Sequence, residues 1–340
     1  MDIEIIKKIV KASGATEGEL ILVHFWGQDT DKSIANNYLR AISAIGATPF
    51  LLQQSRSMNF DIFSVANEKA FDDRYFSFLS NFDAILDVFT YQPVVLDNEM
   101  EKSKFYLYRK YIEQLFSSLI KCKRFTQIRV PTEANAIESG LDPSDYIERI
   151  TRAYDIDYDI LQNSCLREKE RLSTANCLTL QTGKDCILRF DLSGREWHID
   201  AGDGDWPCGE IYIAPIETKT EGTVFFERLY IKESGIFENV ILSIEGGKVV
   251  YSNDEKLNTF LGTLTPENTV VCELGFGMNP NITDLCGYTI LDEKMINTFH
   301  IAIGANHMFG GQNKASIHLD FVGRGQIELI EKGDVKNDRK

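Results

Sequence analysis

The distribution of apolar residues changes near residue 173, and this change constrains the fold more than any other feature of the chain. Before it, short apolar stretches such as 19–25 and 48–54 alternate with longer stretches of helical spacing such as 29–47 and 100–122. Strands that alternate with helices predict a parallel sheet covered by helices on both faces. After residue 173, short strand-like segments follow one another between Gly, Asn and Asp turns, which predicts a mostly β region.

These two patterns predict two domains. We expect an α/β domain with a parallel sheet over 1–173, a mostly β (α+β) domain over 174–332, and a frayed tail over 333–340. The charged stretch 142–172 predicts either one long helix or two. A single short helix is expected in the second domain, near 254–262.

The charge of the chain limits its partners. Its 340 residues carry a formal net charge of −15, whereas binding to phosphates needs a surplus of lysine and arginine. We therefore expect no nucleic-acid partner. The chain contains no uninterrupted stretch of 18 apolar residues, so we also expect no membrane span and no membrane partner.

The cysteines and the N-terminal sequence bear on the compartment. The seven cysteines are an odd number, are scattered, and include no C-x-x-C pair. This indicates reduced core residues rather than a disulfide framework or a thiolate zinc site. The start, MDIEIIKKIVKAS, is interrupted by acidic residues and does not resemble a secretory signal. Together these features predict a cytoplasmic protein.

Apolar strand-like segments of the second domain hold ionisable residues where apolar ones would fit. Alternate side chains of a strand share a face, so His318 and Asp320 are expected to point together. By the same rule Glu273 is expected on the opposite face from Cys272 and Leu274. The residues concerned are Glu210, Glu273, His300, His318 and Asp320.

Buried carboxylates cost several kcal/mol unless they are paired or bind a metal. The five residues offer nitrogen and oxygen donors and no sulfur, which suits zinc, cobalt, manganese or iron. Five ligands exceed what one zinc ion takes from protein and fit two metals that share a carboxylate. Taken singly, a His-x-Asp pair or a strand glutamate is more often a surface feature, and spacing alone does not establish that these residues converge.

Four blocks of the second half occur in the order found in a known family. They are GEIYIAPIE (209–217), ELGFGMNPNI (273–282), ILDEKMINTFHIAIG (290–304) and GGQNKASIHLDFV (310–322). They resemble the patterns G-E-V-x-x-A-P, E-x-x-x-G-x-N, D-E-K with H-x-A-x-G, and N-x-S-x-x-H-x-D of the M29 metallopeptidases, the thermophilic aminopeptidases of the T/S type. The N-terminal half resembles the opening α/β unit of that family less closely.

The resemblance implies a cytoplasmic, dimeric metallo-aminopeptidase. It implies two divalent metals, zinc, cobalt or manganese, with a small-molecule or short-peptide substrate. Glu273 would bridge the metals and take part in catalysis. The family carries a tyrosine seven residues after its ligand histidine, and His307 occupies that position here, which makes His307 a candidate for stabilising an oxyanion or moving a proton. The implied metal ligands are Glu210, Glu273, His300, His318 and Asp320.

Two alternatives remain open at this point. A shorter relative on the same fold, 2,5-dihydroxypyridine 5,6-dioxygenase, uses one non-haem Fe(II) to open an aromatic ring, with a set that resembles two histidines and one aspartate. A non-catalytic binding relative is a third hypothesis, against which the intact set of five ligands argues. The remaining histidines, His24 and His198, are interpreted as structural, and Glu217 as a solvated strand end or a residue that supports the ligands.

Overall fold

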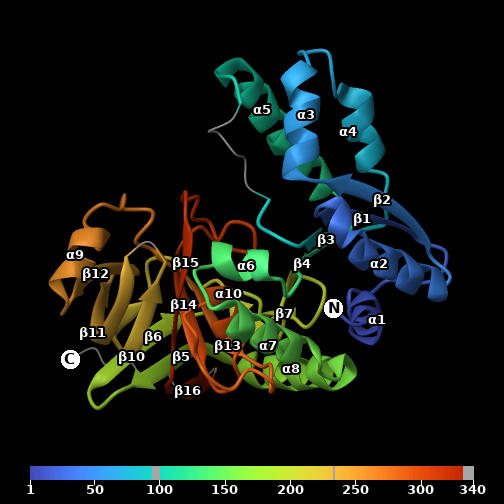
Figure 1. Ribbon diagram of the computed structural model, residues 1–340. Helices are drawn as coiled ribbons and strands as arrows, with labels where there is room; N and C mark the ends of the chain where they lie inside the picture. The colour runs from blue at the N-terminus through green and yellow to red at the C-terminus, as the bar shows by residue number, and fades with distance from the viewer. Residues whose placement is uncertain (94–99, 233, 332–340) are drawn as a thin grey trace. The chain divides into compact units, whose positions relative to one another are not determined.

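The computed structural model describes residues 1–93, 100–232 and 234–331 (Figure 1). The chain forms two compact units: Met1–Tyr158 joined by Gly202–Cys208, and Asp159–Ala201 joined by the chain from Gly209 onward. The predicted boundary at 173 therefore differs from the observed division, which follows Tyr158 and includes a short return to the first unit. The tail predicted over 333–340 lies outside the described residues.

The first unit is built on a five-stranded parallel sheet with the order β2-β1-β3-β4-β8. Two of the strands match the apolar stretches 19–25 and 48–54, two more continue the alternation of strands and helices, and the fifth comes from the returning segment. The strands are β1 (Leu20–Trp26), β2 (Thr48–Gln54), β3 (Ala84–Phe89), β4 (Arg124–Arg129) and β8 (Asp205–Trp206).

Helices connect these strands, as expected for a parallel sheet. One face of the sheet presents Leu22 and Ile85 to a core that also contains Phe63, Phe76 and Tyr111 from three of the helices, α3, α4 and α5, which lie together in Figure 1. The helices of this unit are α1 (Ile3–Ala12), α2 (Lys32–Ala44), α3 (Arg56–Val65), α4 (Asp73–Leu79), α5 (Lys102–Leu119), α6 (Glu133–Glu138) and α7 (Pro143–Tyr154), with a 3-10 turn, η1, at Asp29–Asp31.

The stretch 142–172 forms two helices rather than one. Asp142 caps α7 by accepting hydrogen bonds from the backbone N–H groups of Ser144 and Asp145, and Pro143 occupies the first turn, where its missing N–H costs nothing. This helix ends at Tyr154, and α8 (Tyr158–Leu172) follows. Among the described residues, no helix is both long and apolar enough to cross a membrane.

The second unit contains two antiparallel sheets, as the succession of short strands predicts. The six-stranded sheet has the order β12-β11-β10-β6-β5-β16 and the five-stranded sheet the order β15-β14-β13-β9-β7. The strands are β5 (Ala175–Thr182), β6 (Cys186–Asp191), β7 (His198–Asp200), β9 (Glu210–Ile213), β10 (Glu221–Ile231), β11 (Gly235–Glu245), β12 (Lys248–Ser252), β13 (Val271–Gly277), β14 (Phe299–Gly304), β15 (His318–Gly323) and β16 (Gln326–Glu331).

The two sheets of this unit share an apolar core. Phe226 of β10 packs against Phe299 of β14 and Phe321 of β15, with ring centroids 5.7 and 6.2 Å away. The predicted short helix is present as α9 (Glu255–Leu261), and α10 (Thr289–Asp292) is an additional turn of helix. Because one face of the five-stranded sheet is occupied by this core, its polar side chains lie on the other face.

Candidate metal centre

One face of the five-stranded sheet carries all the residues that the sequence predicts as metal ligands. Residues paired across neighbouring strands project from the same face, as do alternate residues of one strand. The register pairs His300 with Gly275 and Val322, and it pairs Asp320 with Ala302. We call this the donor face; its ionisable residues are His198, Asp200, Glu210, Tyr212, Glu273, His300, His318 and Asp320.

Small residues separate the ionisable ones on the donor face. Gly275 lies between Tyr212 of β9 and His300 of β14 in the register, and a Cβ atom at Gly275 would lie 2.1 Å from His300 Nε2. The imidazole of His300 therefore occupies the space that any side chain at position 275 would fill. A residue larger than glycine there would displace His300 from the centre.

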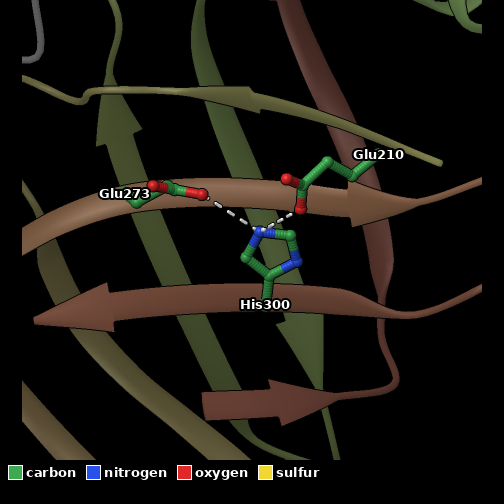
Figure 2. Close-up of side chains that lie close together, drawn as sticks. All are labelled: Glu210, Glu273 and His300. Carbon is green, nitrogen blue, oxygen red and sulfur yellow. Dashed lines mark hydrogen bonds and ion pairs between the residues drawn. The ribbon is translucent and has the colours of Figure 1, made fainter. Parts of the chain in front are cut away.

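The first group of donors comprises Glu210, Glu273 and His300, which come from three adjacent strands (Figure 2). His300 Nε2 lies 3.1 Å from Glu273 Oε1 and 3.4 Å from Glu210 Oε2. All three residues are buried, and one donor atom from each lies within 4.8 Å of the others. One imidazole nitrogen thus faces two carboxylates in a space of the size that a metal ion needs.

The second group comprises Glu273, His318 and Asp320. His318 Nε2 lies 3.4 Å from Glu273 Oε2 and 3.5 Å from Asp320 Oδ1. Glu273 therefore belongs to both groups, with one carboxylate oxygen facing each histidine. The other ring nitrogen of His318, Nδ1, lies 3.0 Å from the carbonyl oxygen of Ala305, and this contact fixes the orientation of the ring.

Two buried polar atoms of the centre have no hydrogen-bond partner among the described residues. They are Glu210 Oε2 and His300 Nδ1. An unpaired carboxylate oxygen in a buried site is costly unless a cation binds it. The donors are carboxylate oxygens and imidazole nitrogens, which divalent first-row metals accept. The residues present therefore fit divalent metal ions.

A buried lysine that the sequence interpretation did not single out supports this centre. Lys294 is only 2% exposed, and its Nζ lies 2.5 Å from Glu210 Oε1 and 2.7 Å from Glu293 Oε1. Lys294 thereby occupies one oxygen of Glu210 and leaves Oε2 facing His300. The sequence did contain a signal for Lys294, since Glu293 and Lys294 belong to the D-E-K part of a family-like block. A charged pair between strands, however, more often indicates a solvated turn.

The protonation equilibria reflect the crowding of carboxylates. Burial raises the pKa of Glu210 to about 8, although the charge of Lys294 opposes this. Burial also raises the pKa of Asp320, and the nearby charge of Glu293 adds to the effect. For His300, burial acts to lower the pKa, but the hydrogen bond with Glu273 and the charge of Glu210 outweigh it and raise the pKa to about 9. A divalent cation among these groups would reverse the cost of holding the carboxylates ionised.

One expectation about strand β13 is wrong. Cys272 was expected on the far face, yet its Sγ lies 3.7 Å from His318 Nδ1. The pairing of β13 with β14 shifts between Val271 and Glu273, and a bulge of this kind breaks the alternation of side chains. Leu274, which follows the bulge, pairs with Ile301 on the apolar face as predicted.

The loop from 305 to 317 positions the remaining candidates. His307 is exposed, makes no hydrogen bond or ion pair among the described residues, and belongs to neither group of donors. Glu217 supports this loop: its Oε1 accepts hydrogen bonds from Asn306 Nδ2 at 3.1 Å and from the backbone N–H of Gln312 at 2.7 Å. The other carboxylate oxygen of Glu217, Oε2, forms an ion pair with the guanidinium of Arg195 at 2.6 Å.

A family model for thermophilic metalloproteases (M29) matches residues 8–331 of the chain. This protein belongs to the M29 family. The match covers both units, and M29 metallopeptidases use divalent metals, in agreement with the donor chemistry of the centre.

Two solved structures share the fold of this chain. A wild-type AmpT from Thermus thermophilus has a TM-score of 0.66 and 16% identity, with 97% of this chain and 97% of that chain covered. The 2,5-dihydroxypyridine dioxygenase from Pseudomonas putida KT2440 also has a TM-score of 0.66 and 16% identity, with 96% and 93% covered. None of the curated proteins matches this chain. At 16% identity, the likeness to these structures shows the fold of this chain but not its reaction. The reaction has to be inferred from the residues of the candidate metal centre.

Proposed function

We propose that this M29 protein is a metal-dependent hydrolase that cleaves an N-terminal peptide bond or a related small amide. Two divalent ions, zinc, cobalt or manganese, would bind at the two groups of donors. The observation that carries the proposal is that Glu273 belongs to both groups, with Oε1 3.1 Å from His300 and Oε2 3.4 Å from His318. A carboxylate with its two oxygens directed to two donor groups can bridge a pair of ions.

Each residue of the centre has a role in this proposal. When bound, the ions would supply Lewis acidity toward the substrate carbonyl and toward water. Glu210 and His300 would hold one ion, His318 and Asp320 the other, and Glu273 both. Lys294 keeps Glu210 oriented by binding its Oε1. Glu273 is also the proposed carrier of the proton that the attacking water loses, and His307 the proposed donor to the developing oxyanion.

The alternative is a mononuclear iron dioxygenase that opens a small aromatic ring, the activity named for one of the structures with this fold. Non-haem iron oxygenases hold the metal with two histidines and one carboxylate. Each group of donors here has two carboxylates and one histidine instead. This composition favours hydrolysis.

Metal analysis combined with activity distinguishes the two candidates. The protein is purified without added metal, analysed for bound metal, and then loaded in turn with zinc, cobalt, manganese and ferrous iron. About two ions per chain, together with cleavage of members of a panel of amino-acid amides, is the expected result. A single iron with oxygen consumption and no cleavage of any amide would replace hydrolysis by oxygenation.

We also propose a cytoplasmic homodimer. All seven cysteines are free, which supports a reducing compartment. The dimer is implied by the family resemblance, and light scattering after size-exclusion chromatography tests it directly.

A further inference from the structure

Three aromatic side chains contact one another at the donor face. Tyr212 lies on the donor face itself, in register with Gly275 and therefore beside the ring of His300 that crosses Gly275. His198 is paired with Tyr212 on the next strand, and their rings stack at 5.3 Å with an angle of 26° between their planes. The third ring, Phe309, comes from the loop between β14 and β15.

Phe309 connects the two ends of the centre. Its ring is nearly perpendicular to that of Tyr212, at 5.5 Å and 80°, and nearly perpendicular to that of His318, at 6.0 Å and 81°. Two rings at right angles form a corner with one apolar wall on each side. We call Tyr212 and Phe309, with His198 behind Tyr212, the aromatic corner.

Hydrogen bonds hold the loop of the aromatic corner, and its rings remain partly exposed. The loop that carries Phe309 is fixed on both sides, because Arg195 donates a hydrogen bond to the carbonyl oxygen of Gly310 and the Phe309 N–H donates to Asn306 O at 3.2 Å. Tyr212 and Phe309 are both only half-buried. Partly exposed rings on a fixed framework, next to the donors, form a surface for binding an apolar group.

We propose that the aromatic corner binds the side chain of the substrate's first residue and selects a large apolar side chain, above all an aromatic one. The proposal rests on the proposed hydrolysis of N-terminal amides. Carboxylates surround the metal positions, so a charged acidic side chain would be repelled, and a small side chain would leave both rings in contact with water. Phe309 touches the His318 ring, which places the corner within one side-chain length of the reacting groups.

The test compares variants on a panel of phenylalanine, leucine, alanine, glutamate and lysine amides. Wild type should show a kcat/KM for the phenylalanine amide at least about tenfold above that for the alanine amide, because even one methylene more or less in a hydrophobic pocket is worth roughly 10- to 200-fold in specificity. Phe309→Ala should bring this ratio toward one. The neighbouring Met308, which is 82% exposed, supplies the matched control, and Met308→Ala should leave the ratio unchanged.

A second readout does not depend on turnover. Calorimetry of the zinc-loaded protein should show that L-phenylalanine binds more tightly than L-alanine, and that Phe309→Ala removes the difference. Circular dichroism checks that the variants are folded, and Phe309→Leu, which preserves bulk but not the flat ring, replaces Phe309→Ala if the latter does not fold. For Phe309→Leu, the expected result is a smaller loss confined to the aromatic substrate.

The outcomes separate this inference from the function on which it rests. Cleavage of amides with no preference for large apolar residues, or with a preference for lysine, overturns the aromatic corner and leaves hydrolysis standing. Absence of cleavage throughout the panel overturns hydrolysis of such amides, and calorimetry then decides the corner alone. Equal binding of L-phenylalanine and L-alanine by the wild type would overturn it.

Discussion

Two regions of the molecule place a histidine beside a carboxylate on adjacent buried strands, but their surroundings differ. In the first unit, His24 Nδ1 lies 2.7 Å from Asp87 Oδ1, and both side chains are fully buried. Gln127 donates its amide to the other oxygen, Asp87 Oδ2, at 3.3 Å. Trp26 and Phe116 pack edge-on against the imidazole. Both carboxylate oxygens therefore have partners, and the pair is surrounded by apolar rings.

In the candidate metal centre of the second unit, the carboxylates outnumber their positively charged and hydrogen-bonding partners. The carboxylates of Glu210, Glu273, Glu293 and Asp320 share one lysine and two imidazoles, and Glu210 Oε2 has no hydrogen-bond partner among the described residues. A His–carboxylate contact is thus present in both regions, and the contact alone does not indicate function. The surplus of carboxylates distinguishes the candidate metal centre from the structural pair.

The largest effect is expected from Glu273→Gln. An amide cannot supply two anionic oxygens, so bound metal should fall from about two ions per chain to one or none, and hydrolysis should fall by about a thousandfold or more, about 4 kcal/mol in the activation free energy. Metal analysis and amide turnover measure this.

The matched control in the other region is Asp87→Asn. It should leave metal content unchanged and cost about 1–3 kcal/mol of stability through the weakened buried hydrogen bonds. Full metal occupancy in Glu273→Gln, or loss of metal in Asp87→Asn, would contradict the distinction between the two regions.

The next largest effect concerns Lys294→Met. This change keeps the unbranched shape and most of the length of the side chain but leaves Glu210 and Glu293 without their shared cation. Removal of one partner from a buried ion pair costs about 3–5 kcal/mol, and we expect a loss of this size in the free energy of unfolding measured with a chelator present. Added zinc should restore part of it, because divalent ions neutralise the same carboxylates. A variant as stable as wild type in chelator would show that Lys294 is not needed to balance the centre.

The pH dependence of stability should reveal the surplus of buried carboxylates in the candidate metal centre. In the folded protein the pKa of Glu210 is raised by burial from 4.5 to about 8, and the pKa of His300, despite burial, is raised by Glu273 from 6.5 to about 9. Raised values mean that the folded state binds these protons more tightly than the unfolded chain, so the stability they contribute is lost as the pH rises. The pKa of Glu293 is lowered, and that effect acts only below its ordinary value of 4.5.

Thermal unfolding in chelator should therefore show a falling midpoint between pH 4.5 and about 9, and saturating zinc should flatten the curve at the alkaline end. Asp87→Asn should fall in parallel with wild type if the first region does not contribute to this slope. A midpoint that rises across this range in the absence of metal would show that the carboxylates of the centre are not crowded in the folded state.

The sequence predicted the donor face well because strand alternation is a strong geometric rule. His300, His318 and Asp320 lie on the face opposite Phe299, Ile301 and Phe321, as their spacing requires. The convergence of Glu210 with them depends on the pairing of β9 with β13, which no local pattern records. Family-like blocks supplied that information, and the bulge at Cys272 shows where alternation alone fails.

Other parts of the fold were not predictable from local pattern. In α3, Phe60, Ile62 and Val65 are apolar but lie at or near the surface, so the helix has no clear apolar stripe. Trp206 of β8 joins the parallel sheet through pairing with Ile128 although it follows strands of the other unit. Lys294 was overlooked because its burial depends on two carboxylates, one of them distant in the sequence.

The smallest effect is expected from His307, which belongs to neither kind of region. It is exposed and has no partner among the described residues, so its removal should cost no stability and no bound metal. If it donates to the developing oxyanion as proposed, His307→Ala should lower kcat by roughly tenfold with little change in KM. His307→Tyr should retain measurable turnover and extend the alkaline limb of the pH profile, because a phenol loses its proton several pH units above an imidazole. Met308→Ala on the same exposed loop is the control. If His307→Ala matches that control in kcat and in pH profile, the proton and the oxyanion must be handled by the buried donors and their metals alone.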